Sequence, residues 1–181
     1  MQVRPTSDRL RETLFNVIAP QIEGTHFLDL CAGSGAIGIE ALSRGAAHVT
    51  FVDRSREMCG LVESNLDLVK IPEEETEVVQ SEAEEFLRRP PGRRGSAGRH
   101  PNATPWDLVY FDPPYAIDCL AVLKLFGENA QALLAEDGCL IVEHHHKNEL
   151  PDEIGSIRRQ RILKQGESAL SFFEVVTSIT I

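Results

Sequence analysis

An apolar run in the second half of the chain ends in four residues that suggest chemistry, Asp112-Pro113-Pro114-Tyr115. Because proline fixes φ and lacks an N–H, we expect a rigid turn with the Pro113 carbonyl facing outward. The Asp112 carboxylate and this carbonyl could accept both N–H bonds of an exocyclic nucleobase amine, which would free the lone pair of its nitrogen. Asp112 could then take the released proton. The alternative is a purely structural turn in which Asp112 caps local backbone.

Tyr115 completes this segment, and we expect its ring to stack on the base. A base that starts inside a helix would have to be flipped out to reach the turn. The four residues together therefore predict a site for a nucleobase amine.

A glycine-rich turn is the second chemical feature. Gly33-Ser34-Gly35-Ala36-Ile37-Gly38 satisfies G-x-G-x-x-G between a predicted strand and a predicted helix, so the backbone can pass close to a nucleotide-like ligand. Asp53 follows Gly33 by twenty residues and is placed to bind both hydroxyls of a ribose. These two features fit a nicotinamide dinucleotide as well as other nucleotide cofactors.

Asp29 separates the two kinds of ligand. It lies four residues before Gly33, and its negative charge would repel a pyrophosphate but suits a ligand that carries an ammonium and a sulfonium. The sequence therefore favours S-adenosylmethionine over a dinucleotide. The alternatives are a structural αβ turn for the glycines and a helix N-cap for Asp53.

Alternating strands and helices must position these residues. Apolar runs and turn signals predict strands at 25–31, 48–53, 77–80, 106–112, 139–143, 157–163 and 170–176. Helices are predicted within 1–20, at 36–44, after an N-cap at Ser55, and at 82–89 and 120–134. This order indicates an α/β fold with a mainly parallel seven-stranded sheet, helices on both faces and a C-terminal antiparallel hairpin around Gly166. Asp29, Asp53 and Asp112 would then meet at the carboxyl edge of the sheet.

Length and composition indicate one domain over residues 1–181, because 181 residues with 42% hydrophobic content can bury a single core. No apolar run is long enough to span a bilayer and no secretion signal is evident, so we expect a cytoplasmic protein. Residues 90–105 are rich in Pro, Gly, Arg and Ser, and we expect them to form a flexible loop.

The net charge of −10 excludes a protein that holds nucleic acid by bulk electrostatics. Cations cluster locally at Arg4, Arg9 and Arg11 and between Arg88 and Arg99. The four cysteines form no C-x-x-C pair and are expected to be free thiols. The run His144-His145-His146 is interpreted as a strand end and loop, and no metal is assigned.

With these residues assembled, the chain resembles the bacterial 16S ribosomal RNA guanine-N2 methyltransferase family, RNA small-subunit methyltransferase D. The resemblance covers nearly the whole chain: Arg4 to Asn16 is similar to the N-terminal signature, Leu28 to Gly45 to the cofactor motif and Asp112 to Tyr115 to the catalytic motif. It implies a Rossmann-like class I fold that transfers a methyl group from S-adenosylmethionine, with S-adenosylhomocysteine as product. It also implies a substrate guanine in 16S ribosomal RNA, within a 30S particle or assembly intermediate, and a monomeric enzyme without metal or membrane attachment.

The family's site residues carry over where the motifs match. The cofactor residues implied are Asp29, Ala32, Gly33, Ser34, Gly35, Asp53, Arg54, Ser81, Glu82 and Ala83. Asp112, Pro113, Pro114 and Tyr115 would hold the guanine. Arg4, Thr6 and Arg9 would contact RNA.

The sequence departs from the family pattern at three places. The signature stands at the start of the chain without the short basic strand that usually precedes it, so part of an RNA-binding surface is expected to be missing. Glu82 replaces a shorter polar residue at the adenine position. The arginine-rich segment is longer than expected, and its alternatives are a solvated loop and an RNA clamp.

Other functions fit parts of the same sequence. A DNA adenine-N6 methyltransferase would share the Asp-Pro-Pro-Tyr segment, although 181 residues leave no room for a separate target-recognition domain. A nicotinamide-dependent oxidoreductase would use the glycines and Asp53 but leaves Asp29 without a role. A catalytically silent module that binds ribosomal RNA is the third alternative.

Overall fold

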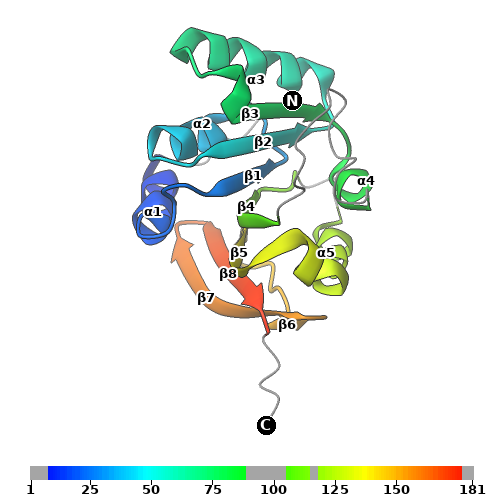
Figure 1. Cartoon of the computed structure of the whole chain (residues 1–181). Coiled ribbons are helices and arrows are strands. Elements are labelled where there is room, and N and C mark those ends of the chain that lie inside the picture. Colours follow the sequence, from blue (N-terminus) through cyan, green and yellow to red (C-terminus); the bar gives the residue numbers. More distant parts are fainter. Residues whose placement is uncertain (1–7, 89–104, 115–117, 177–181) are drawn as a thin grey trace.

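The structure is a computed structural model that describes residues 8–88, 105–114 and 118–176. Arg4, Thr6 and Tyr115 lie outside the described residues, as does nearly all of the predicted loop at 90–105. Figure 1 draws these segments as a thin grey trace.

A single mixed sheet of eight strands runs through the described part of the chain, in the order β3-β2-β1-β4-β5-β8-β7-β6 (Figure 1). The strands are β1 (His26–Leu30), β2 (His48–Asp53), β3 (Thr76–Gln80), β4 (Trp106–Phe111), β5 (Leu134–His145), β6 (Glu153–Ile154), β7 (Ile157–Gln165) and β8 (Ser168–Val175). β1 to β5 pair in parallel, whereas β8, β7 and β6 pair antiparallel. The predicted α/β class with a mainly parallel sheet and a C-terminal hairpin is confirmed.

Two details of the sheet prediction are wrong. The sheet has eight strands rather than seven, because the two-residue β6 is too short to leave a hydrophobic period in the sequence. The predicted strand at 139–143 is part of a longer β5 that already begins at Leu134, and the register of β5 with β4 shifts between Trp106 and Leu108. Gly138 permits this irregularity, because a Cβ there would lie 2.9 Å from the Trp106 carbonyl oxygen.

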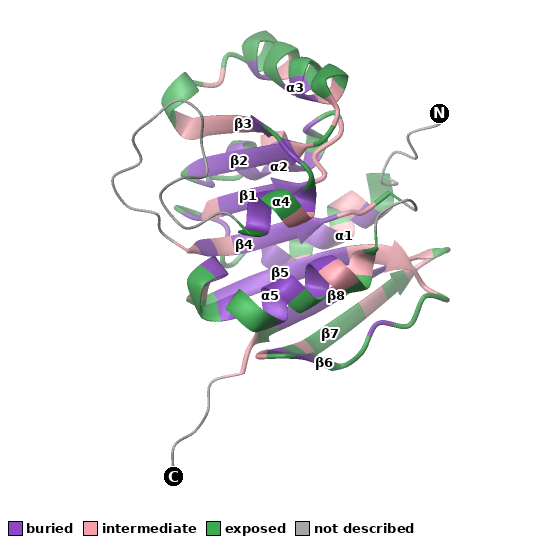
Figure 2. Cartoon of the chain, turned by 90° about the vertical axis from the view of Figure 1, so that its right-hand side faces the viewer, coloured by how far each residue is buried: buried purple, intermediate pink, exposed green. Residues whose placement is uncertain are grey.

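Five α-helices and one short 3-10 helix cover the sheet where the structure describes it. They are α1 (Asp8–Ile18), α2 (Ala36–Ser43), α3 (Arg56–Val69), η1 (Glu73–Glu75), α4 (Ala83–Arg88) and α5 (Cys119–Leu133). One core cluster joins α1, α2 and α3 to one face of the sheet, and a second joins α4 and α5 to the other. Figure 2 shows the buried strands between these layers.

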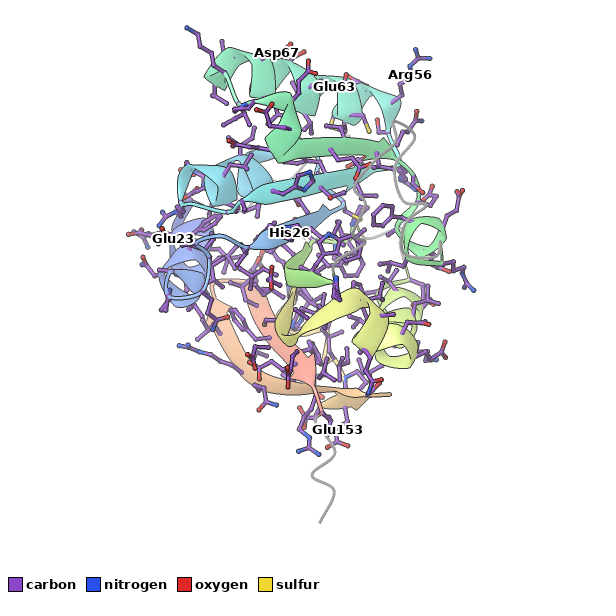
Figure 3. The ribbon with its side chains drawn as sticks, in the orientation of Figure 1. Glu23, His26, Arg56, Glu63, Asp67 and Glu153 are labelled. Atoms are coloured by element: carbon purple, nitrogen blue, oxygen red, sulfur yellow. The ribbon has the colours of Figure 1, made fainter. Side chains whose placement is uncertain are left out.

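The helix α3 has the buried face that its apolar spacing predicts. In α3, the spacing of Cys59, Val62 and Leu66 places their side chains on one buried face. The Ser55 hydroxyl accepts from the Met58 N–H, which caps the start of the helix. Figure 3 shows Arg56 and Asp67 projecting from α3 away from the sheet.

The parallel strands bring distant residues to one edge. Leu30 of β1 is in register with Val52 of β2 and with Phe111 of β4, so the chain leaves all three strands side by side. The start of α1 lies toward the same edge, because Thr13 Oγ1 donates to Gln165 Oε1, at the end of β7, over 3.0 Å. This edge therefore collects the segments on which the predicted site residues lie.

Candidate active site

Asp53, the last residue of β2, is the hub of the candidate cofactor site. Its Oδ2 accepts from the Gly33 N–H over 2.9 Å and its Oδ1 from the Ser55 N–H over 2.8 Å. Its backbone carbonyl accepts from the Ser81 N–H over 3.0 Å. One residue thus connects the loops after β1, β2 and β3. Since each carboxylate oxygen has a second lone pair, Asp53 keeps acceptor capacity for two ribose hydroxyls.

The glycine turn has the backbone that the motif predicts. Gly33 and Gly35 have φ of 54° and 77°, which lie in the left-handed region that glycine adopts without strain. Asn65 of α3 holds the turn from outside, because its Nδ2 donates to the Ser34 carbonyl over 2.9 Å. Gly38 allows α2 to lie against β2, since a Cβ there would stand 2.2 Å from Phe51 Cε1.

Asp29 lies beneath this turn with only 2% of its surface exposed. Its Oδ2 accepts from the Gly38 N–H over 3.0 Å, so the carboxylate holds the first turn of α2 against β1. Burial raises the pKa of Asp29 to about 7, the Gly38 hydrogen bond opposes this shift, and the nearby Asp53 charge adds to it. A cation above the turn would relieve the cost of this buried charge. Its predicted contact with the cofactor ammonium stays a prediction.

Cys31 marks where the candidate cofactor and amine sites meet. Burial raises the pKa of its thiol well above the ordinary value. Four surrounding carboxylates raise it further: Asp53, Asp112, Asp29 and Glu82. The structure therefore brings together four acidic residues that lie far apart in the sequence. Such a concentration of negative charge suits a cationic ligand and opposes a pyrophosphate.

Asp112 and Pro113 leave β4 directly beside Cys31, because Leu30 and Phe111 are the last register pair of β1 and β4. Both residues are partly exposed and Pro114 is exposed. The predicted turn is therefore accessible from outside and adjoins the acidic cluster.

The remaining cofactor candidates lie around Asp53. Ala32 donates its N–H to the Val52 carbonyl over 2.9 Å. Arg54 is exposed and its carbonyl accepts from Gln80 Nε2. Ser81 and Ala83 are buried at the start of α4, whereas Glu82 is exposed between them. All three segments border the acidic cluster, and their contacts with a cofactor stay predictions.

Of the RNA-contact candidates, only Arg9 lies within the described residues. It is exposed in the first turn of α1, toward the edge that carries Asp112. Its neighbour Arg11 pairs with Asp8 and Glu40 instead.

Sequence reasoning missed a pair of polar side chains near the amine turn. Tyr110 of β4 donates its hydroxyl to Glu143 Oε2 of β5 over 2.5 Å. Tyr110 is 2% exposed, and Glu143 is partly exposed near the end of its strand. Glu143 could have been predicted as a site residue, because it is a carboxylate near the end of a buried strand, as Asp53 is. Nothing in the sequence predicts the left-handed backbone of Cys31, with φ of 72°.

The histidine run ends β5 and has local partners. His144 Nε2 lies 2.8 Å from Ser171 Oγ, and its Nδ1 lies 3.0 Å from the His145 carbonyl oxygen. Within the described ranges, no group of three or more His, Cys, Asp or Glu residues is arranged to hold a metal ion. No helix in the described part of the chain is long and apolar enough to cross a membrane.

Comparisons with known proteins relate the chain to a family and to named relatives. The model of the family described as conserved hypothetical protein 95 matches residues 1–174. Ribosomal RNA small subunit methyltransferase D of Escherichia coli is 36% identical over 166 residues, which cover 90% of this chain and 76% of that protein. YlbH of Bacillus subtilis, named as a candidate rRNA methyltransferase, is 35% identical over 175 residues, 94% of this chain and 87% of its own.

A solved structure extends the likeness to the fold. The Escherichia coli protein yhhF, named as a candidate methyltransferase, superposes with a TM-score of 0.80 at 31% identity. The match covers 98% of this chain and 92% of that one. The fold of this chain thus belongs to a known architecture.

Proposed function

The chain belongs to the family of ribosomal RNA small subunit methyltransferase D, and on that premise we propose that it methylates the N2 amine of a guanine in 16S ribosomal RNA. The coarser activity follows from the family: the protein transfers a methyl group from S-adenosylmethionine to ribosomal RNA. The choice of guanine N2 is the part that we propose.

The observation that carries the proposal is the position of the Asp112-Pro113 turn next to the acidic cluster. Asp112 is one of the four carboxylates whose charges raise the pKa of the Cys31 thiol, and two of the others, Asp53 and Asp29, accept backbone N–H groups of the glycine motif. A cationic methyl donor and an amine held at the turn would therefore lie next to each other. Proximity of this kind supplies much of the rate of a two-substrate reaction.

The residues present fit the cofactor. The buried Asp29 carboxylate suits its ammonium, Asp53 has acceptor capacity for its ribose, and Gly33 exposes backbone without a side chain. Ser81, Glu82 and Ala83 are proposed to border the adenine, with Ala32, Ser34, Gly35 and Arg54 completing the site. When bound, S-adenosylmethionine supplies an electrophilic methyl group on a positively charged sulfur.

The protein's own residues would prepare the amine. Asp112 and the Pro113 carbonyl each accept one N–H of the guanine amine, which holds the nitrogen and directs its lone pair toward the donor. Asp112 takes the proton after transfer. Pro114 keeps the turn rigid, and Tyr115 is proposed to stack on the base. Positioning and proton removal are therefore the tasks assigned to this turn.

Contacts with the RNA are proposed for Arg4, Thr6 and Arg9. With a net charge of −10, the chain depends on such local cations for phosphate contacts. We propose a monomer of a single domain that acts in the cytoplasm on a 30S particle or assembly intermediate.

The test is methyl transfer from labelled S-adenosylmethionine to 30S subunits from cells that lack this protein, followed by mass spectrometry of the RNA. We expect one new N2-methylguanine in 16S ribosomal RNA. The matched control is D137A, which removes an exposed aspartate of β5, whereas D112A is expected to be inactive. N6-methyladenine instead of N2-methylguanine in the labelled RNA, or no labelled RNA from protein that binds the cofactor, would contradict the proposal.

A further inference from the structure

The two acceptors of the Asp112-Pro113 turn would bind an amine but would not distinguish the base that carries it. Guanine, adenine and cytosine each have an exocyclic amine with two N–H bonds, so two acceptors hold all three alike. If the proposed function is right, another group near the turn must select guanine. The role of such a group rests on the proposed function.

Glu143 lies where such a group is needed. Phe111 of β4 is in register with Val142 of β5, so the next residues lie side by side: Asp112 just after the end of β4, and Glu143 near the end of β5. Adjacent strands are about 4.8 Å apart, which places the two backbone positions within the width of one base. Glu143 is partly exposed there, so a ligand at the turn can reach it.

The Glu143 side chain is held on the same side of the sheet as Asp29. Tyr110, whose hydroxyl donates to Glu143 Oε2, is the register partner of Asp29. The Tyr110 ring is 2% exposed and belongs to the core cluster beneath α1 and α2. A buried ring with a fixed hydroxyl therefore anchors the carboxylate.

Anchoring leaves the carboxylate able to bind a base. A carboxylate has two oxygens with about four lone-pair positions and donates nothing, and the Tyr110 hydroxyl binds at Oε2. Glu143 therefore accepts further N–H groups and repels a ring nitrogen that presents a lone pair.

Guanine is the amine-bearing base that matches this preference. Its N1–H lies directly beside its N2 amine, so both are donors on one edge of the base. Adenine and cytosine present an acceptor nitrogen beside their amines instead. We propose that Glu143, positioned by Tyr110, accepts the guanine N1–H and so determines which base is methylated.

The decisive comparison uses 2-aminopurine, which keeps the amine at position 2 but has an acceptor at N1. Subunits are reconstituted from 16S ribosomal RNA that carries either guanine or 2-aminopurine at the methylated position. For the unchanged protein, we expect kcat/KM to favour guanine by about 100-fold, since an unmatched polar contact costs a base-reading site about that much.

E143Q is the first variant, because its amide can either accept from N1–H or donate to a bare N1. We expect the preference for guanine to fall to about threefold, with cofactor affinity unchanged. Y110F removes only the hydroxyl and keeps the buried ring, so it is the second variant, and we expect the preference to fall to about tenfold. E149Q makes the same change at an exposed glutamate after β5 and should leave the preference intact.

The outcomes separate this inference from the proposed function. If the unchanged protein does not methylate the guanine subunits, the proposed function fails and the role of Glu143 falls with it. If it methylates guanine and 2-aminopurine equally, or if E143Q and Y110F both retain the full preference, only the role of Glu143 is refuted.

Discussion

Replacing Asp29 by Asn should stabilise the ligand-free protein at high pH and not at low pH. The Asp29 carboxyl is buried, and its pKa lies at about 7 in the folded protein against 3.8 as its ordinary value. Between these values the folded chain holds a proton that the unfolded chain has lost, so the free energy of unfolding falls as the pH rises to about 7. Asn is never ionised and can still accept the Gly38 N–H.

The magnitude follows from this displacement of the pKa. The full difference corresponds to about 4 kcal/mol, at about 1.4 kcal/mol for each tenfold change in proton affinity. Between about pH 5.5 and pH 8, the part that changes is about 2 kcal/mol, because the folded carboxyl releases its proton only near pH 7. The advantage of D29N over the unchanged protein in free energy of unfolding should therefore grow by about 2 kcal/mol from about pH 5.5 to pH 8.

Urea denaturation at both pH values measures the effect. D67N is the matched control, because Asp67 is exposed on α3 and the same substitution there should give no comparable pH dependence. Calorimetric titration with S-adenosylmethionine near pH 6 adds a second measurement: a cofactor ammonium near Asp29 should favour the ionised carboxyl and release a proton, and D29N should release fewer. If D29N and the unchanged protein differ by the same amount at both pH values, the account of Asp29 as a buried, destabilised carboxyl is wrong.

Further substitutions test other contacts. G38A should cost about 3 kcal/mol in urea denaturation, because the new Cβ would stand 2.2 Å from Phe51 Cε1. In the same assay, G60A should raise the free energy of unfolding by about 1 kcal/mol, because nothing lies within 4 Å of the new Cβ in α3. A lower free energy of unfolding for G60A would contradict the helix assignment. S55A should lower thermal stability by about 1 kcal/mol through loss of the N-cap of α3. D112A should abolish methyl transfer while leaving cofactor affinity, measured by titration, within a few-fold, and a large loss of affinity would assign Asp112 to the cofactor instead.

Much of the fold could be predicted because its signals are local. The predicted strand at 48–53 coincides with β2, and the other predicted helices and strands mostly end within one or two residues of the observed ones. Apolar patterns with a period of 2 or about 3.6 depend only on residues that are neighbours in the sequence. The same holds for the turn signals at Gly33 and Gly166 and for the helix N-cap at Ser55. The short β6 and the register shift between β4 and β5 could not be predicted, because each depends on pairing with another strand.

The candidate site also has features that the sequence predicts and features that only the three-dimensional structure shows. The positions of the acidic residues could be predicted from local pattern, since Asp53 and Asp112 each close an apolar run and Asp29 lies one residue before the end of β1, and parallel pairing brings such ends to one edge. Only the tertiary structure showed that their charges converge on Cys31 and that Tyr110 holds Glu143. Those contacts join residues from different strands, whose register is set by packing of the whole sheet and leaves no periodic trace along the chain.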